Sequence, residues 1–535
     1  MTSGAEARIM TDRSQSGWAS PIAPSMPAGS IDITKWWRYK ELRTLNLLLL
    51  IPLLSIFSQG FDGSMMNGLQ AVSQWRIYFG EPKGAILGLF NAAYPLGAVV
   101  GVFFIPSVSD RWGRRMGLAV GAGISVLGGV LQAASVNLAM FVVSRLLLGA
   151  GCVITAGVGS PMVTEIAHPH QRTTATALFL TFYAFGAIIA GWSTFGTFRI
   201  GNSAAWRIPS GLQALPSLVQ FIGIWWVPES PRWLVSKGRI DEAWKMICKY
   251  HGNNDETDEL AIFEFEEIKA AVNSSDDSVR GIKSDIKTLT ALFKTPGNRK
   301  RIAIIVWAAL ASQLSGNAFV SYYLSPILTS VGLKTDLQQT LINATSQMLS
   351  WFSALYFATL PAKLGRRTLF LWSLVCIWIC DICITAGSAL FEKDKNNKAA
   401  GYTVVVFLYL FSPAYNLGFN GNLGLYIPEI LPYELRTTGL AVFYFAQFCF
   451  NILSSFTTPI GLESITWKFY IIFVGWVVVE FVVVYMLFPE TKGPSLEDIA
   501  IIFDGDHYQV EGKDIESSNF NSKEETRTAE QVEKA

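Results

Sequence analysis

Long apolar segments recur along this chain and limit the folds that it can adopt. A helix needs about 20 apolar residues to cross the hydrocarbon core of a bilayer. Twelve segments meet that need: 44–62, 84–106, 116–135, 138–158, 174–194, 209–227, 301–323, 340–361, 368–390, 401–427, 437–459 and 467–488. Because backbone polar groups find no water inside lipid, each segment is expected to be helical. The sequence therefore predicts an all-α integral membrane protein with twelve transmembrane helices.

Composition supports a lipid environment and excludes several classes of protein. Hydrophobic residues make up 51% of the chain and charged residues only 16%, with a formal net charge of +1. Such a balance gives no reason to expect nucleic acid as a partner. The six cysteines lie mostly in apolar runs, where a thiol packs as a small hydrophobe. We expect no disulfide framework, metal site or cofactor, and no nucleophile with a general base marks an enzyme.

A polar segment and an internal repeat divide the chain. DRWGRR at 110–115 corresponds to AKLGRR at 362–367, and EIAHPHQR at 165–172 corresponds to EILPYELR at 429–436. PESPR at 228–232 corresponds to PETKG at 489–493. Repeats at such regular offsets predict two homologous six-helix bundles. The expected parts are a disordered tail 1–43, bundles 44–229 and 301–490, a helical linker 230–300 and a tail 491–535.

Basic residues indicate the orientation in the membrane. An even number of spans places both termini on one side, and cytosolic flanks are richer in Lys and Arg. The basic residues flank the first span and the linker: Lys35, Arg38, Lys40, Arg43, Arg232, Lys237, Arg239, Arg299, Lys300 and Arg301. We therefore expect cytosolic termini and a cytosolic linker.

The repeated motifs resemble those of the sugar porter family of the major facilitator superfamily over residues 44–500. GFDGSMMNGLQ at 60–70 and NGNLGLYIPEILPYELR at 420–436 are similar to fungal lactose permeases and hexose transporters. The resemblance implies a monomeric plasma-membrane carrier, embedded in lipid, that transports a small sugar by alternating access. Three modes stay open: proton symport, facilitated transport of a sugar or polyol, and a non-transporting sensor.

Asp62 and Arg145 are ionisable residues in apolar spans, which is costly unless they pair. The resemblance implies that Asp62 accepts the transported proton and that the charge of Arg145 tunes the pKa of Asp62. The alternative is a pair that only braces the fold.

Polar and aromatic residues on two spans are candidates for substrate binding, since a sugar site needs hydrogen-bonding groups and ring faces. They are Gln313, Asn317, Tyr322, Tyr323, Gln447 and Asn451. The resemblance implies sugar contacts for Gln313 and Gln447, although such amides also serve as bonds between helices. The chain departs from the family pattern at Leu180, Ser312, Ser350 and Gly424. These departures leave the identity of the substrate open.

Charged residues of the repeated motifs form a candidate cytosolic gate. They are expected to pair at helix ends when the inner side is closed, and to set topology as well. The set is Asp110, Arg114, Arg115, Glu165, Arg172, Glu229, Arg232, Arg366, Arg367, Glu429, Arg436 and Glu490. Ala362 replaces the first acid in the second half, which predicts a looser lock there.

Asp381 and Glu480 lie in the ninth and twelfth spans without an evident partner. On peripheral helices we expect them to snorkel or to face lipid as neutral acids.

Overall fold

The computed structural model describes residues 33–274, 289, 290, 292–432, 435–492, 499, 502 and 503. Every regular element within these ranges is a helix. The first half and linker contain η1 Ile33–Arg38, α2 Lys40–Leu48, α3 Leu50–Ala71, α4 Ser73–Tyr78, α5 Gly84–Trp112, α6 Arg114–Ala133, α7 Leu138–Ile166, η2 Pro169–Gln171, α8 Arg172–Thr197, α9 Ala204–Leu212, α10 Ala214–Gly223, η3 Ile224–Trp226, α11 Pro231–Ser236, α12 Ile240–Tyr250 and α13 Glu259–Ser274.

The second half contains α15 Pro296–Leu314, α16 Asn317–Tyr322, α17 Leu324–Ser330, α18 Asp336–Phe357, α19 Pro361–Leu364, α20 Arg366–Lys393, α21 Lys398–Gly418, α22 Asn420–Ile430, α23 Arg436–Ile465 and α24 Lys468–Leu487. Within the described residues, nine helices are long and apolar enough to cross a membrane. The other three expected spans are the broken pair α9 and α10, the polar-ended α15 and the relatively polar α18. The expected span 301–323 is interrupted, because α15 ends at Leu314 before α16 begins.

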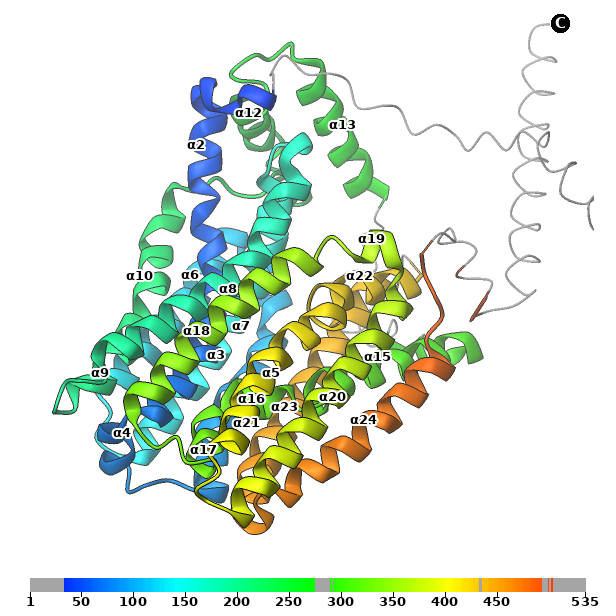
Figure 1. Ribbon diagram of the computed structural model, residues 1–535. Helices are drawn as coiled ribbons and strands as arrows, with labels where there is room; N and C mark the ends of the chain where they lie inside the picture. The colour runs from blue at the N-terminus through cyan, green and yellow to red at the C-terminus, as the bar shows by residue number, and fades with distance from the viewer. Residues whose placement is uncertain are drawn as a thin grey trace, which may run out of the picture.

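The two halves pack with the same internal pattern, as the repeat predicts. In the first half α6 and α5 pack on α7, and α3 packs on α8. In the second half α20 packs on α21 and α24, and α15 packs on α23. The halves meet where α5 contacts α23 and where α8 contacts α18 (Figure 1). These contacts place α3, α7, α15 and α23 in position to build a site from both halves.

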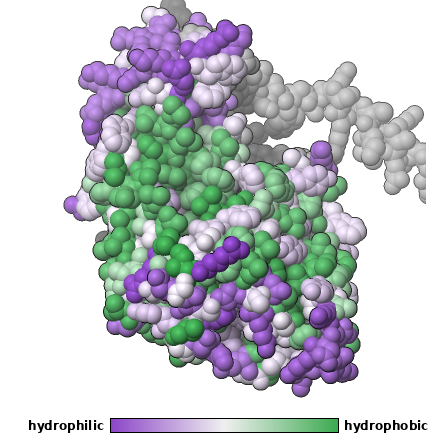
Figure 2. All heavy atoms as spheres, turned by 60° about the vertical axis from the view of Figure 1, so that its left-hand side comes forward, coloured by the Kyte–Doolittle hydropathy of each residue, from purple (hydrophilic) through white to green (hydrophobic). Residues whose placement is uncertain are grey.

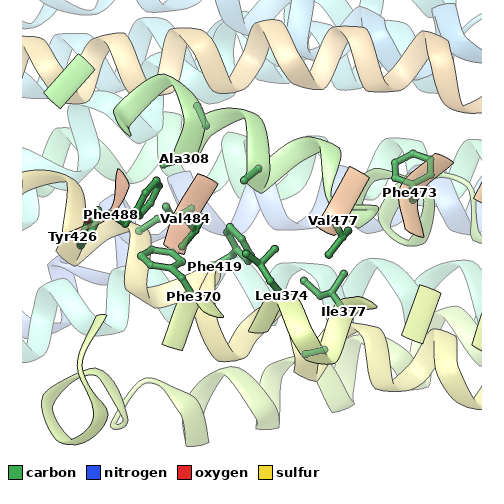
Figure 3. Close-up of a cluster of buried hydrophobic side chains, with 14 of the residues drawn as sticks. Ala308, Phe370, Leu374, Ile377, Phe419, Tyr426, Phe473, Val477, Val484 and Phe488 are labelled. Atoms are coloured by element: carbon green, nitrogen blue, oxygen red, sulfur yellow. The ribbon is translucent and has the colours of Figure 1, made fainter. Parts of the chain in front are cut away.

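Apolar burial holds each half together. Figure 3 shows the second-half core, where Phe370 meets Tyr426 and Phe488 with ring centroids 5.4 and 5.7 Å apart. Leu374, Ile377 and Val477 extend this core along α20 and α24. On the outside, a broad apolar band lies below a hydrophilic end (Figure 2). This distribution suits a helix bundle surrounded by lipid.

A close crossing of α5 and α7 brings Arg145 on α7 near Tyr94 on α5. A Cβ on Gly97 would lie 2.0 Å from the Leu146 carbonyl oxygen, and one on Gly149 would lie 2.0 Å from the Tyr94 carbonyl oxygen. Small residues let membrane helices approach closely. The crossing sets the guanidinium carbon of Arg145 5.8 Å from the ring centre of Tyr94.

In the described part of the linker, α11, α12 and α13 are helical and pack on the first half. Leu234, Ile247 and Phe265 join a core cluster with Leu118 and Ile166 at the ends of the membrane helices. We call this end of the molecule the linker face. Residues 33–43 differ from the expected disordered tail, because η1 and the start of α2 are helical and Leu42 is fully buried. Residues 1–32 and most of 491–535 lie outside the described ranges.

Candidate functional site

A buried ion pair lies inside the first half. Arg145 on α7 donates from Nη1 to Asp62 Oδ1 at 3.0 Å and from Nη2 to Oδ2 at 3.1 Å. The side chains of Asp62 and Arg145 are 2% and 1% exposed. Two parallel bonds of this kind fix the geometry of both groups. A single isolated charge at this depth would be expensive, so each residue makes the other tolerable.

Gln213 is a third member of this site that sequence reasoning missed. It lies between α9 and α10, is 1% exposed, and donates from Nε2 to Asp62 Oδ1 at 2.7 Å. Asp62 and Gln213 are 151 positions apart, so only the fold brings them together. The available signal was an amide inside the apolar span 209–227.

Four of the candidate binding residues gather between α15, α16 and α23. Asn451 donates to Gln313 Oε1 at 2.8 Å, and Gln447 donates to Ser312 Oγ at 3.4 Å. Tyr322 interacts with Asn451 through its hydroxyl. Tyr415, which sequence reasoning also missed, donates from its hydroxyl to the Ser312 carbonyl oxygen at 2.9 Å. The group combines amides with tyrosine rings, which is the chemistry that polyhydroxylated ligands need.

The two remaining candidates are placed differently. Tyr323 is fully buried in the core cluster that contains Phe61 and Trp75, and its hydroxyl donates to the Ser455 carbonyl oxygen. Its role here is packing, instead of the expected substrate contact. Asn317 accepts a bond from Ser321 Oγ at 3.0 Å within α16.

Asp381 and Glu480 require a correction. We expected snorkelling or lipid-facing acids, but their side chains are 1% and 0% exposed. They lie on α20 and α24, which pack against each other inside the second half. Across the described residues, their carboxylate oxygens have no hydrogen-bond partner. A buried ionised acid without a partner is strongly disfavoured, so these groups are expected to be neutral.

The motif charges form the same corner in both halves. Glu229 accepts the backbone N–H of Arg114 at 3.0 Å, and Glu490 accepts that of Arg366 at 2.7 Å. These acceptors cap α6 and α20 at the positive ends of their helix dipoles. Gly113 and Gly365 precede the capped helices with φ of 94° and 92°. A Cβ on either glycine would lie within 2.6 Å of the capping carboxylate, so this close approach requires glycine.

The side-chain ion pairs of Arg114 and Arg366 lie within their own halves. Arg114 pairs with Glu165 and Asp110, both at 3.1 Å, and Arg366 pairs with Glu429 at 2.8 Å. Arg115 and Arg367 donate to the Trp225 and Tyr485 carbonyl oxygens. Arg232 lies exposed on α11, and Arg436 begins α23. Arg366 donates from Nη1 to the Pro361 carbonyl oxygen at 3.0 Å, as Arg114 does to the Ser109 carbonyl oxygen at 3.2 Å, and Ala362 stands where the first half has Asp110.

Arg172 joins a network that ties the linker to the first half. It donates to Glu264 Oε1 at 3.0 Å, while His251 contacts Glu264 Oε2 at 2.6 Å. Burial alone would raise the pKa of Glu264, but His251 and Arg172 outweigh it and lower that pKa. Beside them, burial and the neighbouring His251 lower the pKa of His168 to about 3. The docked linker therefore holds Glu264 ionised and His168 neutral.

The hydrogen bonds that join the two halves lie at the end opposite the linker face. Asn67 and Gln70 on α3 donate to the backbone carbonyl oxygens of Ser321 and Tyr322. Ser73 and Arg76 on α4 donate to Asp336 at the start of α18, and the Arg76 contact is 3.3 Å. We call these four residues and their partners the outer seal. Their bonds join α3 and α4 of the first half to α16 and α18 of the second half.

A model of the family described as "Sugar (and other) transporter" matches residues 48–503. This chain belongs to that family. The transporter is 29% identical to the MFS-type transporter criB of Aspergillus cristatus, covering 90% of this chain and 96% of the relative. It is 26% identical to a high-affinity glucose transporter of Kluyveromyces lactis, covering 87% and 86%.

The fold of the transporter matches solved structures of XylE. An inward-open structure from E. coli has a TM-score of 0.70 at 20% identity, covering 86% of this chain and all of that one. XylE is described in another solved structure as a proton:xylose symporter. The chain is thus a multi-pass membrane transporter of the major facilitator fold, and not an enzyme. The predicted fold class and family are confirmed.

Proposed function

We propose that this transporter carries a sugar across the plasma membrane together with a proton, by alternating access. The main support for this proposal is the buried pair of Asp62 and Arg145, whose charges compensate each other inside the membrane. Proton uptake on Asp62 would leave Arg145 uncompensated, so protonation must alter the energy of this site. The names of the glucose-transporting relative and of XylE support the choice of a sugar and a proton.

In this proposal, Gln313, Tyr322, Gln447 and Asn451 bind the sugar from the second half. The linker face and both termini are cytosolic, and the molecule works as a monomer. The outer seal joins the halves on the extracellular side. On the linker face, Arg114 and Arg366 pair within their own halves. Because the outer seal joins the halves while Arg114 and Arg366 pair within their own halves at the linker face, an inward-facing state is favoured.

The test is Asp62→Asn, which keeps the shape of the side chain and removes its titration. We expect labelled-sugar exchange to persist while accumulation against a gradient disappears. Wild-type cells should alkalinise the medium when sugar is added, and the variant should not. Glu242→Gln, an exposed linker acid with a 2.6 Å contact to Arg239, is the matched control. If no transported sugar causes alkalinisation in wild-type cells, symport is wrong.

The variant needs a stability control. Removing one member of a buried ion pair costs about 3–5 kcal/mol in stability. Surface expression and the unfolding temperature in detergent should therefore be measured for each variant before its transport is compared. A carrier that never accumulates sugar and is indifferent to pH would instead be a facilitator.

A further inference from the structure

Gln213 uses only one end of its amide in this structure. Its Nε2 donates to Asp62 Oδ1 at 2.7 Å. Its Oε1 is buried and lacks a hydrogen-bond partner among the residues that the structure describes. An orphaned acceptor next to a titratable group is unusual, because buried polar atoms are normally satisfied. The amide therefore holds an unused acceptor close to the Asp62 carboxylate.

The bonds around Asp62 fit one protonation state. Oδ1 accepts from Arg145 and Gln213, and Oδ2 accepts from Arg145. A carboxylate can accept all three, but a carboxylic acid must place its own proton on an acceptor. Arginine offers no acceptor, whereas an amide offers both a donor and an acceptor. Rotation of the Gln213 amide by half a turn would present Oε1 to the new hydroxyl.

We propose that Gln213 is a positioning residue whose amide reverses when Asp62 takes up a proton. This inference rests on the proposed function of Asp62. A hydronium ion of the aqueous phase gives up the proton by breaking one O–H bond and leaves as water; the proton forms an O–H bond at Oδ1, and that hydroxyl donates to Gln213 Oε1. No other covalent bond changes. Arg145 keeps its charge, so the pair passes from neutral to a net charge of +1.

Four other titratable groups lie near Asp62. Tyr94 on α5, Cys152 on α7, Tyr183 on α8 and Tyr322 on α16 lie within electrostatic range. In the described part of the chain, Arg145 and Gln213 are the two that donate hydrogen bonds to its carboxylate. Gln213 is thus the partner in place to serve both protonation states.

The test is infrared difference spectroscopy of the purified carrier as the pH is changed. The carboxylic acid C=O band of Asp62 is identified by its loss in Asp62→Asn. In Gln213→Met, which keeps length but removes both polar atoms, we expect this band to move to higher frequency. Gln220→Met is the control, because Gln220 on α10, the helix that follows Gln213, donates to Ser55 Oγ at 2.7 Å and not to Asp62. The Asp62 band of the Gln220→Met protein should have the same frequency as in wild type.

Gln213→Glu keeps the test decisive if the methionine variant does not fold. At low pH a protonated glutamate can donate and accept, so the wild-type band frequency should return. As the pH rises, the nearby second acid should make the Asp62 band persist to higher pH than in wild type. A band unchanged in frequency and pH range in these variants would overturn the role of Gln213. The absence of any Asp62 band in wild type at every pH would instead refute proton binding at Asp62.

Discussion

Two amide side chains of the second-half cluster should contribute to sugar affinity. Gln313→Ala and Gln447→Ala each remove a hydrogen-bonding group of the proposed sugar site, worth about 1 kcal/mol or more. Apparent affinity should fall about fivefold or more, while folding and delivery are retained. Uptake kinetics in transport-null cells measure this, with the exposed amide of Gln338→Ala as control. Unchanged affinity in both variants would remove the proposed pocket.

His168 makes linker docking sensitive to acid. Its pKa of about 3 lies below the usual 6.5, so the undocked state binds the extra proton as the pH falls. Docking should weaken below pH 6.5 by about 1.4 kcal/mol per unit until pH 3. Glu264, with its lowered pKa, adds stability above its usual pKa of about 4.3 that is lost as the pH falls below it.

Hydrogen exchange in α12 and α13, corrected for intrinsic rates, measures this pH effect. Exchange should rise between pH 7 and 5.5 in wild type. His168→Leu should flatten that rise, whereas His170→Leu, at an exposed position two residues on, should keep it. Equal slopes in all three proteins would show that His168 does not govern docking.

Among the helices, the N-terminal cap of α6 depends on glycine at position 113. Gly113→Ala would place a methyl group 2.5 Å from the Glu229 carboxylate at φ of 94°. Loss of the cap and backbone strain together should cost about 2 kcal/mol or more. Thermal unfolding in detergent measures the loss. Gly238→Ala, at φ of 74° with open space around it, isolates the strain and should cost less.

The elements also indicate what sequence could and could not predict. Apolar length located the nine helices that are long and apolar enough to cross a membrane among the described residues, because lipid imposes that length on each helix separately. The break between α15 and α16 was missed, since an apolar run does not reveal it. At the other end of α16, the backbone carbonyl groups of Ser321 and Tyr322 accept bonds from Asn67 and Gln70, which lie 254 and 252 positions away in the sequence. Asp62 and Arg145 were paired through the family resemblance, while Gln213 required the fold itself.

For the two halves together, the outer seal should set the balance between a state open at the linker face and a state open at the opposite end. Asp336→Asn removes a charge that accepts bonds from Ser73 and Arg76. A loss of about 1.4 kcal/mol shifts such a balance tenfold. Spin-label distances between the halves at the end opposite the linker face should show a larger fraction that is open at that end. Glu81→Gln, the partner of Arg76 within its own half, should leave the distances unchanged.

The helix caps at Gly113 and Gly365 are two copies of the same local structure within one chain. The same substitution can be made twice, once beside Glu229 and once beside Glu490, in a single protein and a single membrane. The copies differ because Arg114 also pairs with Asp110, whereas the second half has Ala362 at the equivalent position. Any difference between the paired variants therefore reports how unequally the two halves share the work of one transport cycle.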